Sequence, residues 1–501
     1  MHDWGRARAF GTGLLVVLGS NLIASCSNWP DNPGIDPYPA ELHYPTGLAV
    51  MDLDPSDGSD APTHMVVANS DFDLGFNAAA VQSYDLRVLN EAIDANCVGM
   101  AVWERQACVI ASSQAKSATD HPSTLTAVYP TDGLFLSEVL IEAYADGMEI
   151  GSNGTRLYIP VRSNSDVTRI DVSPDGLLSC GGTPGVRAHC TDAYQSTLKS
   201  AAELRGVDYV TDPVDLVTGS LSDFGLAADM GDYVAMAHRS GAMSFFVVPG
   251  TGMGTDQPDQ PILTGTLLGI GNSLSGIVRE PTATSSSFWI ASGNSTYVPR
   301  VTVAIDGQST ASQVLSASVS LDRPVPIVGL DFGTSRTANF RQFAFDPRPG
   351  HEGYVYGVSR RPDALAFFRR DPLSGSYVVE DLVPIGVEGM RMQLVTFDDA
   401  QMNTHLVAFV SCYQSRNIFV IDVDHHKTIG IVSGLSGPFE FEVDKTRQRL
   451  YVLDFRTSVV RVVTLAPLVA CLTDPNPSPN QQCSPAILGM LGVPNAVEYL
   501  R

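Results

Sequence analysis

Short apolar segments and polar turns alternate along most of the chain, and the alternation has a recurring form. Residues 406–423 (LVAFVSCYQSRNIFVIDV) and 449–465 (RLYVLDFRTSVVRVVTL) each contain an apolar segment, a short polar turn and a second apolar segment. The segments are rich in Val, Ile, Phe and Tyr, and they alternate or run apolar over the length of a β-strand, which is typical of half-buried or buried strands. Each stretch therefore predicts a β-hairpin.

The same hairpin recurs upstream, which indicates an internal repeat. Five further copies lie at residues 63–86, 156–172, 233–248, 287–305 and 354–370. Most copies follow an apolar segment such as PTGLAV or RQFAFD and precede another such as LFLSEVLIEA or YVVEDLVPIG, so each predicts a four-stranded sheet. Seven such sheets predict a closed ring, because radial repetition leaves only short, protected edges. A stacked solenoid is the alternative.

The repeat resembles a known family. RLYVLDFRTSVVRVV (449–463) and NIFVIDVDHHKTIGIVSG (417–434) are similar to the blade motif of YVTN/YncE-like seven-bladed β-propellers. The resemblance covers about residues 41–465 and implies an all-β fold, a seven-bladed β-propeller. Such propellers host unrelated activities, so it implies little about function. Residues 466–501 contain a looped stretch and an apolar segment, and we expect them to form a C-terminal clasp that completes the propeller.

Composition and charge support this fold class and exclude one class of partner. With 44 glycines, 32 prolines and only 17% charged residues, the chain favours many short strands and turns over long solvated helices. The formal net charge is −23. An acidic surface repels nucleic acid and anionic lipid headgroups, so we do not expect a nucleic-acid partner.

The N-terminus carries an export signal. Arg6 and Arg8 precede an apolar stretch at 11–24 that is too short to span a membrane, so residues 1–25 are expected to be a signal peptide. Its end, Ile23-Ala24-Ser25-Cys26, resembles a bacterial lipobox. The resemblance implies cleavage before Cys26 and diacylation of its thiol, which anchors a protein stably to a membrane. An ordinary secretory signal is the alternative.

The residues after the lipobox bear on location. Ser27 follows the cysteine where an aspartate would mark retention at the inner membrane, so the cell outer membrane is favoured, on its periplasmic or surface-facing side. Residues 26–40 are polar and proline-rich and predict a flexible tether.

The seven later cysteines suggest local disulfides. Three near neighbours in sequence, Cys97 with Cys108, Cys180 with Cys190 and Cys471 with Cys483, would each close a short loop in an exported chain. The fold is thus expected to carry disulfide-pinned loop insertions, and Cys412, in an apolar stretch, to be a buried free thiol. Zinc is the rival interpretation, but no motif with zinc-ligand spacing is present, and we expect neither metal nor cofactor.

Arginine recurs in the predicted hairpin turns of this acidic chain. We expect these turns to lie on one mouth of the ring, where guanidinium groups could bind a carboxylate, phosphate or sulfate. The alternative is that each arginine pairs with a nearby carboxylate such as Asp166, Asp363 or Asp454. His238 adjoins one turn and could act there as a base or ligand-binding group. The candidate ligand-binding residues are Arg162, His238, Arg239, Arg360, Arg361 and Arg456.

Other motifs give little chemistry. Asp52, Asp54, Asp57 and Asp60 cluster around a glycine but lack the EF-hand pattern, which favours a solvated turn over a calcium site. The sequence has no nucleophile elbow and no phosphate-binding loop leading into a helix, so no catalytic residue is assigned.

We therefore expect a membrane-anchored propeller that binds or scaffolds another envelope protein or an extracellular ligand such as a polymer. The cysteine-pinned insertions at 88–125 and around Cys180–Cys190 are the candidate recognition surfaces. These insertions could equally be decoration. Two alternatives stay open: a lactonase-like hydrolase with a site at the propeller mouth, as the resemblance implies for relatives, and a structural subunit of a surface complex. The oligomeric state is not predicted.

Overall fold

The computed structural model describes residues 35–54, 60–116, 127–197, 210–250, 260–281, 286–293, 297–306, 316–322, 324–328, 339–399, 401, 403–474 and 483–494. Chain contacts divide the protein into two units, Met1–Asp36 and Pro37–Arg501. The second unit holds all the elements described below. The proposed signal peptide and Cys26 lie outside the described residues, as do Asp57 and most of the predicted tether.

The second unit consists of seven β-sheets that follow one another along the chain. The first sheet contains β1 (Pro45–Met51), β2 (His64–Asn69), β3 (Ala79–Asp85) and β6 (Phe135–Ile141). The second contains β7 (Glu149–Ile150), β8 (Arg156–Val161), β9 (Asp166–Val172), β10 (Leu178–Ser179) and β11 (Gln195–Thr197). The third contains β12 (Pro213–Ser220), β13 (Gly231–His238), β14 (Ala242–Pro249) and β15 (Ile262–Leu267). Short 3₁₀ helices η2 (Leu221–Phe224) and η3 (Ala228–Met230) join β12 to β13.

The other four sheets continue the series. The fourth contains β16 (Leu274–Arg279), β17 (Ser287–Ser292), β19 (Arg300–Asp306) and β20 (Ser316–Leu321), and the sixth contains β26 (Gly389–Asp398), β27 (Thr404–Cys412), β28 (Asn417–Asp422) and β29 (Lys427–Val432). The fifth contains β22 (Phe340–Phe345), β23 (Tyr354–Arg360), β24 (Asp363–Arg370) and β25 (Tyr377–Pro384), and is extended by β21 (Val325–Val328) and β18 (Tyr297–Val298). The seventh contains β30 (Pro438–Asp444), β31 (Arg449–Asp454), β32 (Val459–Thr464) and β33 (Ala486–Leu491), and is extended by β4 (Cys108–Ser112) and β5 (Ala127–Thr131).

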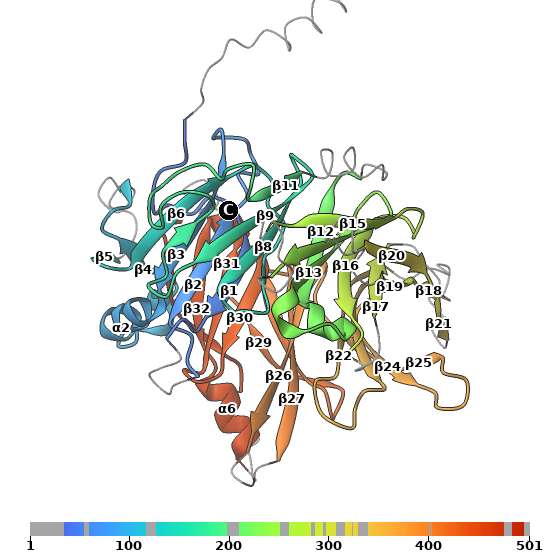
Figure 1. Ribbon diagram of the computed structural model, residues 1–501. Coiled ribbons are helices and arrows are strands. Elements are labelled where there is room, and N and C mark those ends of the chain that lie inside the picture. Colours follow the sequence, from blue (N-terminus) through green and yellow to red (C-terminus); the bar gives the residue numbers. More distant parts are fainter. Residues whose placement is uncertain are drawn as a thin grey trace, which may run out of the picture. The chain divides into compact units, whose positions relative to one another are not determined.

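The first strand of each sheet lies on the inside of a closed ring, so the protein is an all-β propeller. Successive inner strands β7, β12, β16, β22, β26 and β30 contact one another, and β30 contacts β1. The ring closes between the first and second sheets, where the Thr46 hydroxyl donates to the Ala145 carbonyl at 2.8 Å. Figure 1 shows the last strands, in red, beside the first strands, in blue.

The second and third strands of the sheets are buried on both faces against neighbouring sheets, which explains the nearly continuous apolar runs in the sequence. Strands β13 and β14 are buried along almost their whole length. Between the third and fourth sheets, Tyr233 stacks on Phe245 with ring centroids 5.6 Å apart, and Phe245 meets Phe288 edge-on. Burying a large apolar side chain in this way stabilises the fold by about 1.5–3 kcal/mol.

The predicted hairpins are confirmed most closely near the C-terminus. The hairpin expected at 449–465 is β31 and β32, joined by the 3₁₀ helix η5 (Phe455–Thr457), and the hairpin expected at 406–423 is β27 and β28. The two strands of each hairpin pair antiparallel. Alternation of apolar and polar residues was thus a reliable guide where both strands and their turn are contiguous.

The insertion at 88–125 has a structural role that its sequence did not predict. Its helix α2 (Leu86–Asn96) buries Leu86, Leu89 and Ile93 and is followed by the short α3 (Val102–Arg105). Strand β4 then pairs parallel with the C-terminal strand β33, and β5 pairs parallel with β4. The described part of this insertion therefore extends the outer edge of the last sheet.

The C-terminal segment completes the last sheet. Helix α6 (Ala466–Thr473) leads towards β33, which pairs antiparallel with β32 and parallel with β4. Three of the four core strands of this sheet come from residues 438–464 and the fourth from residues 486–491. The C-terminal strand thus completes a sheet begun by the C-terminal hairpin, and strands from residues 108–131 are added outside it.

All three predicted disulfides are present. Cys97–Cys108 joins the end of α2 to β4, Cys180–Cys190 closes a loop after β10, and Cys471–Cys483 joins α6 to the segment before β33. Cys412 is a buried free thiol, as expected. The Cys97 and Cys108 side chains lie in the core shared by the first and last sheets.

We predict that replacing Cys97 and Cys108 together with alanine lowers the free energy of unfolding by about 3 kcal/mol, because the closed loop constrains the unfolded chain. Amide hydrogen exchange should also speed up in β33, which pairs with β4. Replacing Cys180 and Cys190, which close a loop of similar length far from β33, is the matched control. Equal protection of β33 in both variants would contradict a role for the first disulfide in closing the ring.

Candidate functional site

The hairpin turns between the second and third strands lie at one end of the ring, which we call the turn face. Arg162 follows β8, Arg239 lies between β13 and β14, Arg360 ends β23, and Arg456 lies in η5 between β31 and β32. In antiparallel sheets whose inner strands run in the same sense around a ring, these turns share one end. The opposite end, where the first strand turns into the second, is called the link face.

Arg162 and Arg239 both face the carboxylate of Asp212, which belongs to neither of their hairpin turns. The Arg162 Nε atom lies 2.6 Å from an oxygen of Asp212, and the Arg239 Nε atom lies 3.9 Å from the other oxygen. Asp212 immediately precedes β12. The arginine of one turn therefore pairs with the segment that begins the next sheet.

Of the three carboxylates expected to pair with the turn arginines, Asp363 lies near Arg360, whereas Asp166 and Asp454 have other partners. Asp166 is buried and accepts a hydrogen bond from the Thr168 hydroxyl, and burial raises its pKa to about 7. Asp454 is also buried and accepts from the backbone N–H of Gly437 at 2.7 Å and from Arg461. Asp166 therefore bonds along its own strand and Asp454 bonds within its own sheet, and no ion pair joins either carboxylate to Arg162, Arg239, Arg360 or Arg456 among the described contacts.

Arg360 and Arg361 differ in their surroundings. Arg360 Nε donates to the Gly389 carbonyl at 2.9 Å. Burial lowers the Arg360 pKa, with a smaller contribution from the charge of Arg239, although the nearby carboxylates of Glu388 and Asp363 oppose this. Arg361 is exposed, and its side chain has no carboxylate partner among the described residues. Arg239 is also largely exposed, at 57% of its side chain. The turn face thus presents guanidinium groups to solvent in a chain that is acidic overall.

A cluster of six aromatic residues occupies the rest of the turn face, and we call it the aromatic cluster. Phe72 is 55% exposed, in the turn between β2 and β3, and it meets Tyr144 and Phe455 edge-on at 6.0 and 5.7 Å. Phe455 also contacts Tyr44, Tyr413 and Phe439. These residues come from the first, second, sixth and seventh sheets.

The aromatic cluster and the arginines form one continuous arc. The Arg456 guanidinium lies over the Tyr413 ring, 4.7 Å from its centroid, and its Nε donates to the Tyr413 hydroxyl at 3.2 Å. At the other end of the cluster, the Arg162 backbone N–H donates to the Tyr144 carbonyl at 3.1 Å. A ligand on the turn face would therefore meet apolar rings and cationic groups side by side.

His238 does not lie on this surface, contrary to the sequence-based expectation. It is the last residue of β13 and is fully buried, and one ring nitrogen lies 2.9 Å from the Ser244 hydroxyl oxygen. Burial lowers its pKa to about 4, so the ring is neutral at neutral pH. Its neighbour Arg239 is in the turn, but alternation along the strand directs His238 into the blade, where it cannot contact a ligand at the turn face.

A second group of charged residues lies on the inner strands and was missed by sequence reasoning. Asp215 of β12 and Arg391 of β26 are both 91% or more buried, and the Asp215 carboxylate lies 2.8 Å from Arg391 Nη1. These strands belong to the third and sixth sheets, which are not neighbours, so the pair meets near the ring axis. The axial cluster comprises Asp146, Asp215, Arg341, Arg391, Glu440 and Glu442.

The axial cluster holds more carboxylates than guanidinium groups, which perturbs its pKa values. Burial raises the pKa of Glu440 to about 7, opposed by Arg391. Burial and then the charge of Glu440 raise the pKa of Glu442 to about 8, and Gln393 donates to Glu442 at 3.1 Å. The pKa of Arg341 falls to about 10 because of burial and the nearby Arg391.

Gly147 allows Arg391 to reach this position. The glycine has a φ of +85°, and a Cβ atom there would lie 2.8 Å from Arg391 Nη2. One carboxylate oxygen of Asp146 and one of Glu440 are buried with no hydrogen-bond partner among the described residues. A signal for the axial cluster did exist in the sequence, because single charged residues stand inside otherwise apolar inner strands such as PVDLV and FRQFAF.

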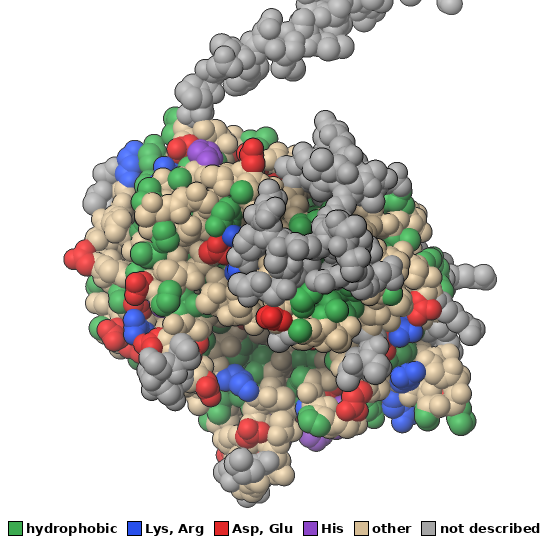
Figure 2. Space-filling model, in the orientation of Figure 1, with side chains coloured by type: hydrophobic (Ala, Val, Ile, Leu, Met, Phe, Trp, Pro, Cys, Tyr) green, Lys and Arg blue, Asp and Glu red, His purple; other side chains and the backbone are tan. Residues whose placement is uncertain are grey.

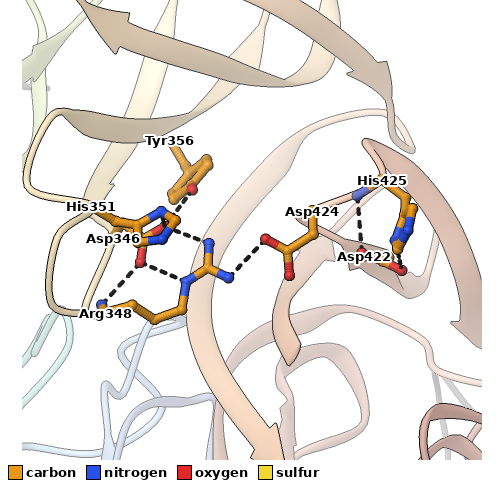
Figure 3. Close-up of polar contacts among 7 residues, drawn as sticks. All are labelled: Asp346, Arg348, His351, Tyr356, Asp422, Asp424 and His425. Carbon is orange, nitrogen blue, oxygen red and sulfur yellow. Dashed lines mark hydrogen bonds and ion pairs between the residues drawn. The ribbon is translucent and has the colours of Figure 1, made fainter. Parts of the chain in front are cut away.

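The link face carries an ion-pair network that joins the fifth and sixth sheets (Figure 3). Asp346 is buried beneath the loop that follows β22, and it accepts hydrogen bonds from Arg348 Nη2 at 2.8 Å and from the Tyr356 hydroxyl at 2.7 Å. Arg348 Nη1 also donates to Asp424, between β28 and β29, at 2.7 Å. Hydrogen bonds from Arg348 and Tyr356 hold the Asp346 pKa below its ordinary value although burial opposes this.

A groove of about 750 Å³ opens beside this network. It is lined by the loop before β23, the last residues of β26, the first residue of β27 and the end of β30 with Lys445. This volume lies within the range of ligand-binding pockets. Figure 2 shows acidic and basic side chains scattered singly over the visible face and not gathered into one charged patch.

The described residues contain neither a metal-binding cluster nor a helix long enough to span a membrane. Within the described ranges, no group of three or more His, Cys, Asp and Glu side chains is arranged to hold a metal ion. The Asp54 N–H donates to the Asp52 carboxylate at 3.1 Å in a local turn. None of the helices in the described part of the chain is long and apolar enough to cross a bilayer.

No protein-family model matches the sequence, and no curated protein matches it. Among solved structures, a protein from Bacteroides fragilis named as a proposed 6-phosphogluconolactonase superposes with a TM-score of 0.45 and 12% identity, covering 71% of this chain and 89% of that one. Hydrazine synthase of Kuenenia stuttgartiensis gives 0.45 and 9%, covering 87% and 98%. A protein from Lactobacillus plantarum gives 0.42 and 11%, covering 77% and 82%. The propeller assignment rests on the inner-strand contacts described above.

We predict that Glu442→Gln reduces the pH dependence of stability. A carboxyl group whose pKa is raised in the folded state binds more protons there than in the unfolded chain, so the free energy of unfolding falls as pH rises from about 4.5 to about 8. Above that window the variant should be more stable than the parent by on the order of 1–3 kcal/mol, measured by urea unfolding. Glu91→Gln, on the exposed side of α2, is the control, and identical pH profiles for Glu442→Gln and the parent would refute the assignment.

Proposed function

We propose that this protein is an exported, lipid-anchored, seven-bladed propeller that binds a protein partner through its turn face. Each of the seven sheets would be one blade of the ring. The observation that carries the binding proposal is the arc in which the aromatic cluster adjoins Arg162, Arg239, Arg360 and Arg456. Protein interfaces are enriched in aromatic residues and arginine, and a few such residues dominate their binding energy.

The geometry of the rings favours a protein over a sugar polymer. Phe72 meets both Tyr144 and Phe455 with interplanar angles of 88° and 77°, so neighbouring rings cover one another's faces with their edges. The cluster therefore offers protruding apolar groups, Phe72 at 55% and Leu74 at 58% exposure, and few open flat faces on which sugar rings could stack. Exposed apolar groups of this kind mark protein interaction sites.

The exposed guanidinium groups indicate the charge of the partner surface. Arg239 in the arc and Arg361 beside it are exposed, and Arg162 pairs with Asp212 through its Nε atom. Carboxylates of a partner could bind these groups through two parallel hydrogen bonds. We infer a partner surface with an apolar pocket for Phe72 and Leu74 and acidic residues around it. The lactonase-like alternative is less favoured because His238, its proposed base, is buried.

Export and lipidation rest on the sequence of residues 1–26 and on the three disulfides, since disulfides persist in oxidising compartments. Anchoring at the outer membrane would hold the propeller close to other envelope proteins. We therefore propose that the protein is a scaffold: the lipid anchor holds it at the membrane, and the turn face binds the partner there.

Lipidation predicts a specific mature N-terminus. Mass spectrometry of the protein purified from membranes should find Cys26 as the first residue, carrying a thioether-linked diacylglycerol. Cys26→Ala should abolish the lipid mass and release the chain from the membrane fraction. A mature chain that begins at another residue, or at an unmodified Cys26, would refute the anchor.

For the turn face, a photo-crosslinking amino acid placed at Phe72 should give one defined protein adduct in intact envelopes. The same group at Ser318, on the outer strand β20, is the control and should give none. Arg239→Glu should reduce the Phe72 adduct at least tenfold, because it replaces the cation that faces the partner's carboxylates. Equal adducts from both positions, or a Phe72 adduct unaffected by Arg239→Glu, would contradict the proposal.

A further inference from the structure

The inner strand β26 extends further along the link face than the strands beside it. It has ten residues, Gly389–Asp398, whereas β22 and β30 on either side have six and seven. Strand β26 pairs with β27 on one edge only. The hairpin of β26 and β27 projects at the lower end of the molecule in Figure 1. The last residues of β26 also line the 750 Å³ groove.

The hydrogen-bond alternation along β26 shows which backbone groups face the groove. In an antiparallel pair, residues alternate between those bonded to the partner strand and those directed away from it. Asp399 N–H donates to the Asn403 carbonyl at 2.9 Å, so Asp399 and every second residue before it face β27. The residues between them, Leu394, Thr396 and Asp398, must direct their N–H and C=O groups away from β27.

Two independent contacts confirm this alternation. Met392, which has the same parity as Thr396, donates its N–H away from β27 to the Gln342 side chain at 2.6 Å. The Lys445 ammonium donates to the Thr396 carbonyl at 3.3 Å and lies 3.4 Å from the Thr396 hydroxyl. Lys445 thus approaches the edge of β26 that is opposite β27.

The edge from Leu394 to Asp398 is therefore an open strand edge inside a groove. Among the described residues, the Thr396 carbonyl is the one backbone group of this edge with a hydrogen-bond partner, and that partner is a flexible lysine. The edge is about 13 Å long at the usual rise of a strand. Exposed strand edges are templates for pairing with another chain, and proteins commonly protect them with lysine.

The charges around the groove indicate which kind of strand would fit. Lys445 is exposed, and among the described residues its ammonium bonds to neutral groups of Thr396 and to no carboxylate. Arg348 and His351 also line the groove, but carboxylates already face both: Arg348 pairs with Asp346 and Asp424, and a His351 ring nitrogen lies 3.8 Å from Asp346. Asp398 accepts a hydrogen bond from the Thr404 hydroxyl at 2.7 Å, so Lys445 is the cation that the groove offers to a ligand. Leu394 and Val443 supply apolar lining between the charged groups. An incoming strand with alternating apolar and acidic side chains matches this lining.

We propose that the link-face groove binds an extended acidic polypeptide segment, which adds a strand to the free edge of β26. Main-chain hydrogen bonds to Leu394, Thr396 and Asp398 would give affinity, and Lys445 would pair with an acidic side chain of the segment. This mode of recognition uses main-chain bonds for affinity and side-chain pockets for specificity. The site lies at the opposite end of the ring from the turn face and is independent of the function proposed there.

The test uses the mature protein and two blocked five-residue peptides, acetyl-VEVEV-amide and acetyl-VKVKV-amide, with binding measured by NMR titration and by amide hydrogen exchange. We expect the acidic peptide to bind at least tenfold more tightly than the basic one and to slow exchange at the amides of Leu394, Thr396 and Asp398. Equal affinity for both peptides, absence of binding at millimolar concentration, or binding without protection of these amides would overturn the proposal.

Variants and a modified peptide separate strand addition from simple charge attraction. Lys445→Glu should weaken binding of the acidic peptide at least tenfold, whereas Lys427→Glu, the same charge change on the exposed outer strand β29, should not. Thr396→Pro removes one outward N–H and should abolish binding. If that variant does not fold, an acidic peptide N-methylated along one edge answers the same question in the unaltered protein. If binding is unchanged whichever edge of the peptide is N-methylated, no strand is added.

Discussion

Face-to-face packing of neighbouring sheets is the interaction on which the rest of this structure depends. Each sheet has apolar residues on both faces, so none can be stable alone, and each gains a partner on either side only when the series closes. Contacts between β1 and β30 and between Thr46 and Ala145 complete that closure. The turn face, the axial cluster and the link-face groove all exist because the closed ring brings distant parts of the chain together, either at one of its two ends or near its axis.

Closure is reinforced at the last sheet, where three separate regions of the chain meet. Strand β33 from the C-terminus lies between β32 and β4, and the disulfide Cys97–Cys108 fixes β4 to the helix before it. Helix α2 contributes to the same core, and its Asn90 donates to the Tyr451 hydroxyl at 2.8 Å. The described part of the insertion at 88–125 thus links the first and last sheets.

The ring also explains how an acidic chain tolerates charge at its centre. Asp215 and Arg391 can pair only because the third and sixth sheets face each other across the axis. A buried pair of this kind contributes little net stability, since desolvation offsets the attraction, but loss of either partner would leave an uncompensated charge. The excess of carboxylates is accommodated by raised pKa values at Glu440 and Glu442, which allow these groups to be neutral near physiological pH.

Local features were predictable from the sequence, and features that depend on distant pairing were not. The hairpins of β27–β28 and β31–β32 and the three disulfides follow from contiguous patterns and short spacings. The parallel addition of β4 and β5 to β33 could not be predicted, because the partners are more than 350 residues apart and no turn joins them. For the same reason, the sequence did not predict that Asp212 pairs with Arg162, or that the axial cluster forms. The burial of His238, in contrast, could have been predicted from the apolar strand in which it stands.

The separation between the Asp215 and Arg391 side chains in a crystal structure of the mature protein tests the central claim most directly. A closed ring predicts that the two groups are within hydrogen-bond distance, as they are here at 2.8 Å, although their sheets are three apart in the series. An open stack of sheets would instead hold them far apart and leave β1 and β30 out of contact. That result would contradict the ring and, with it, both binding surfaces derived from it.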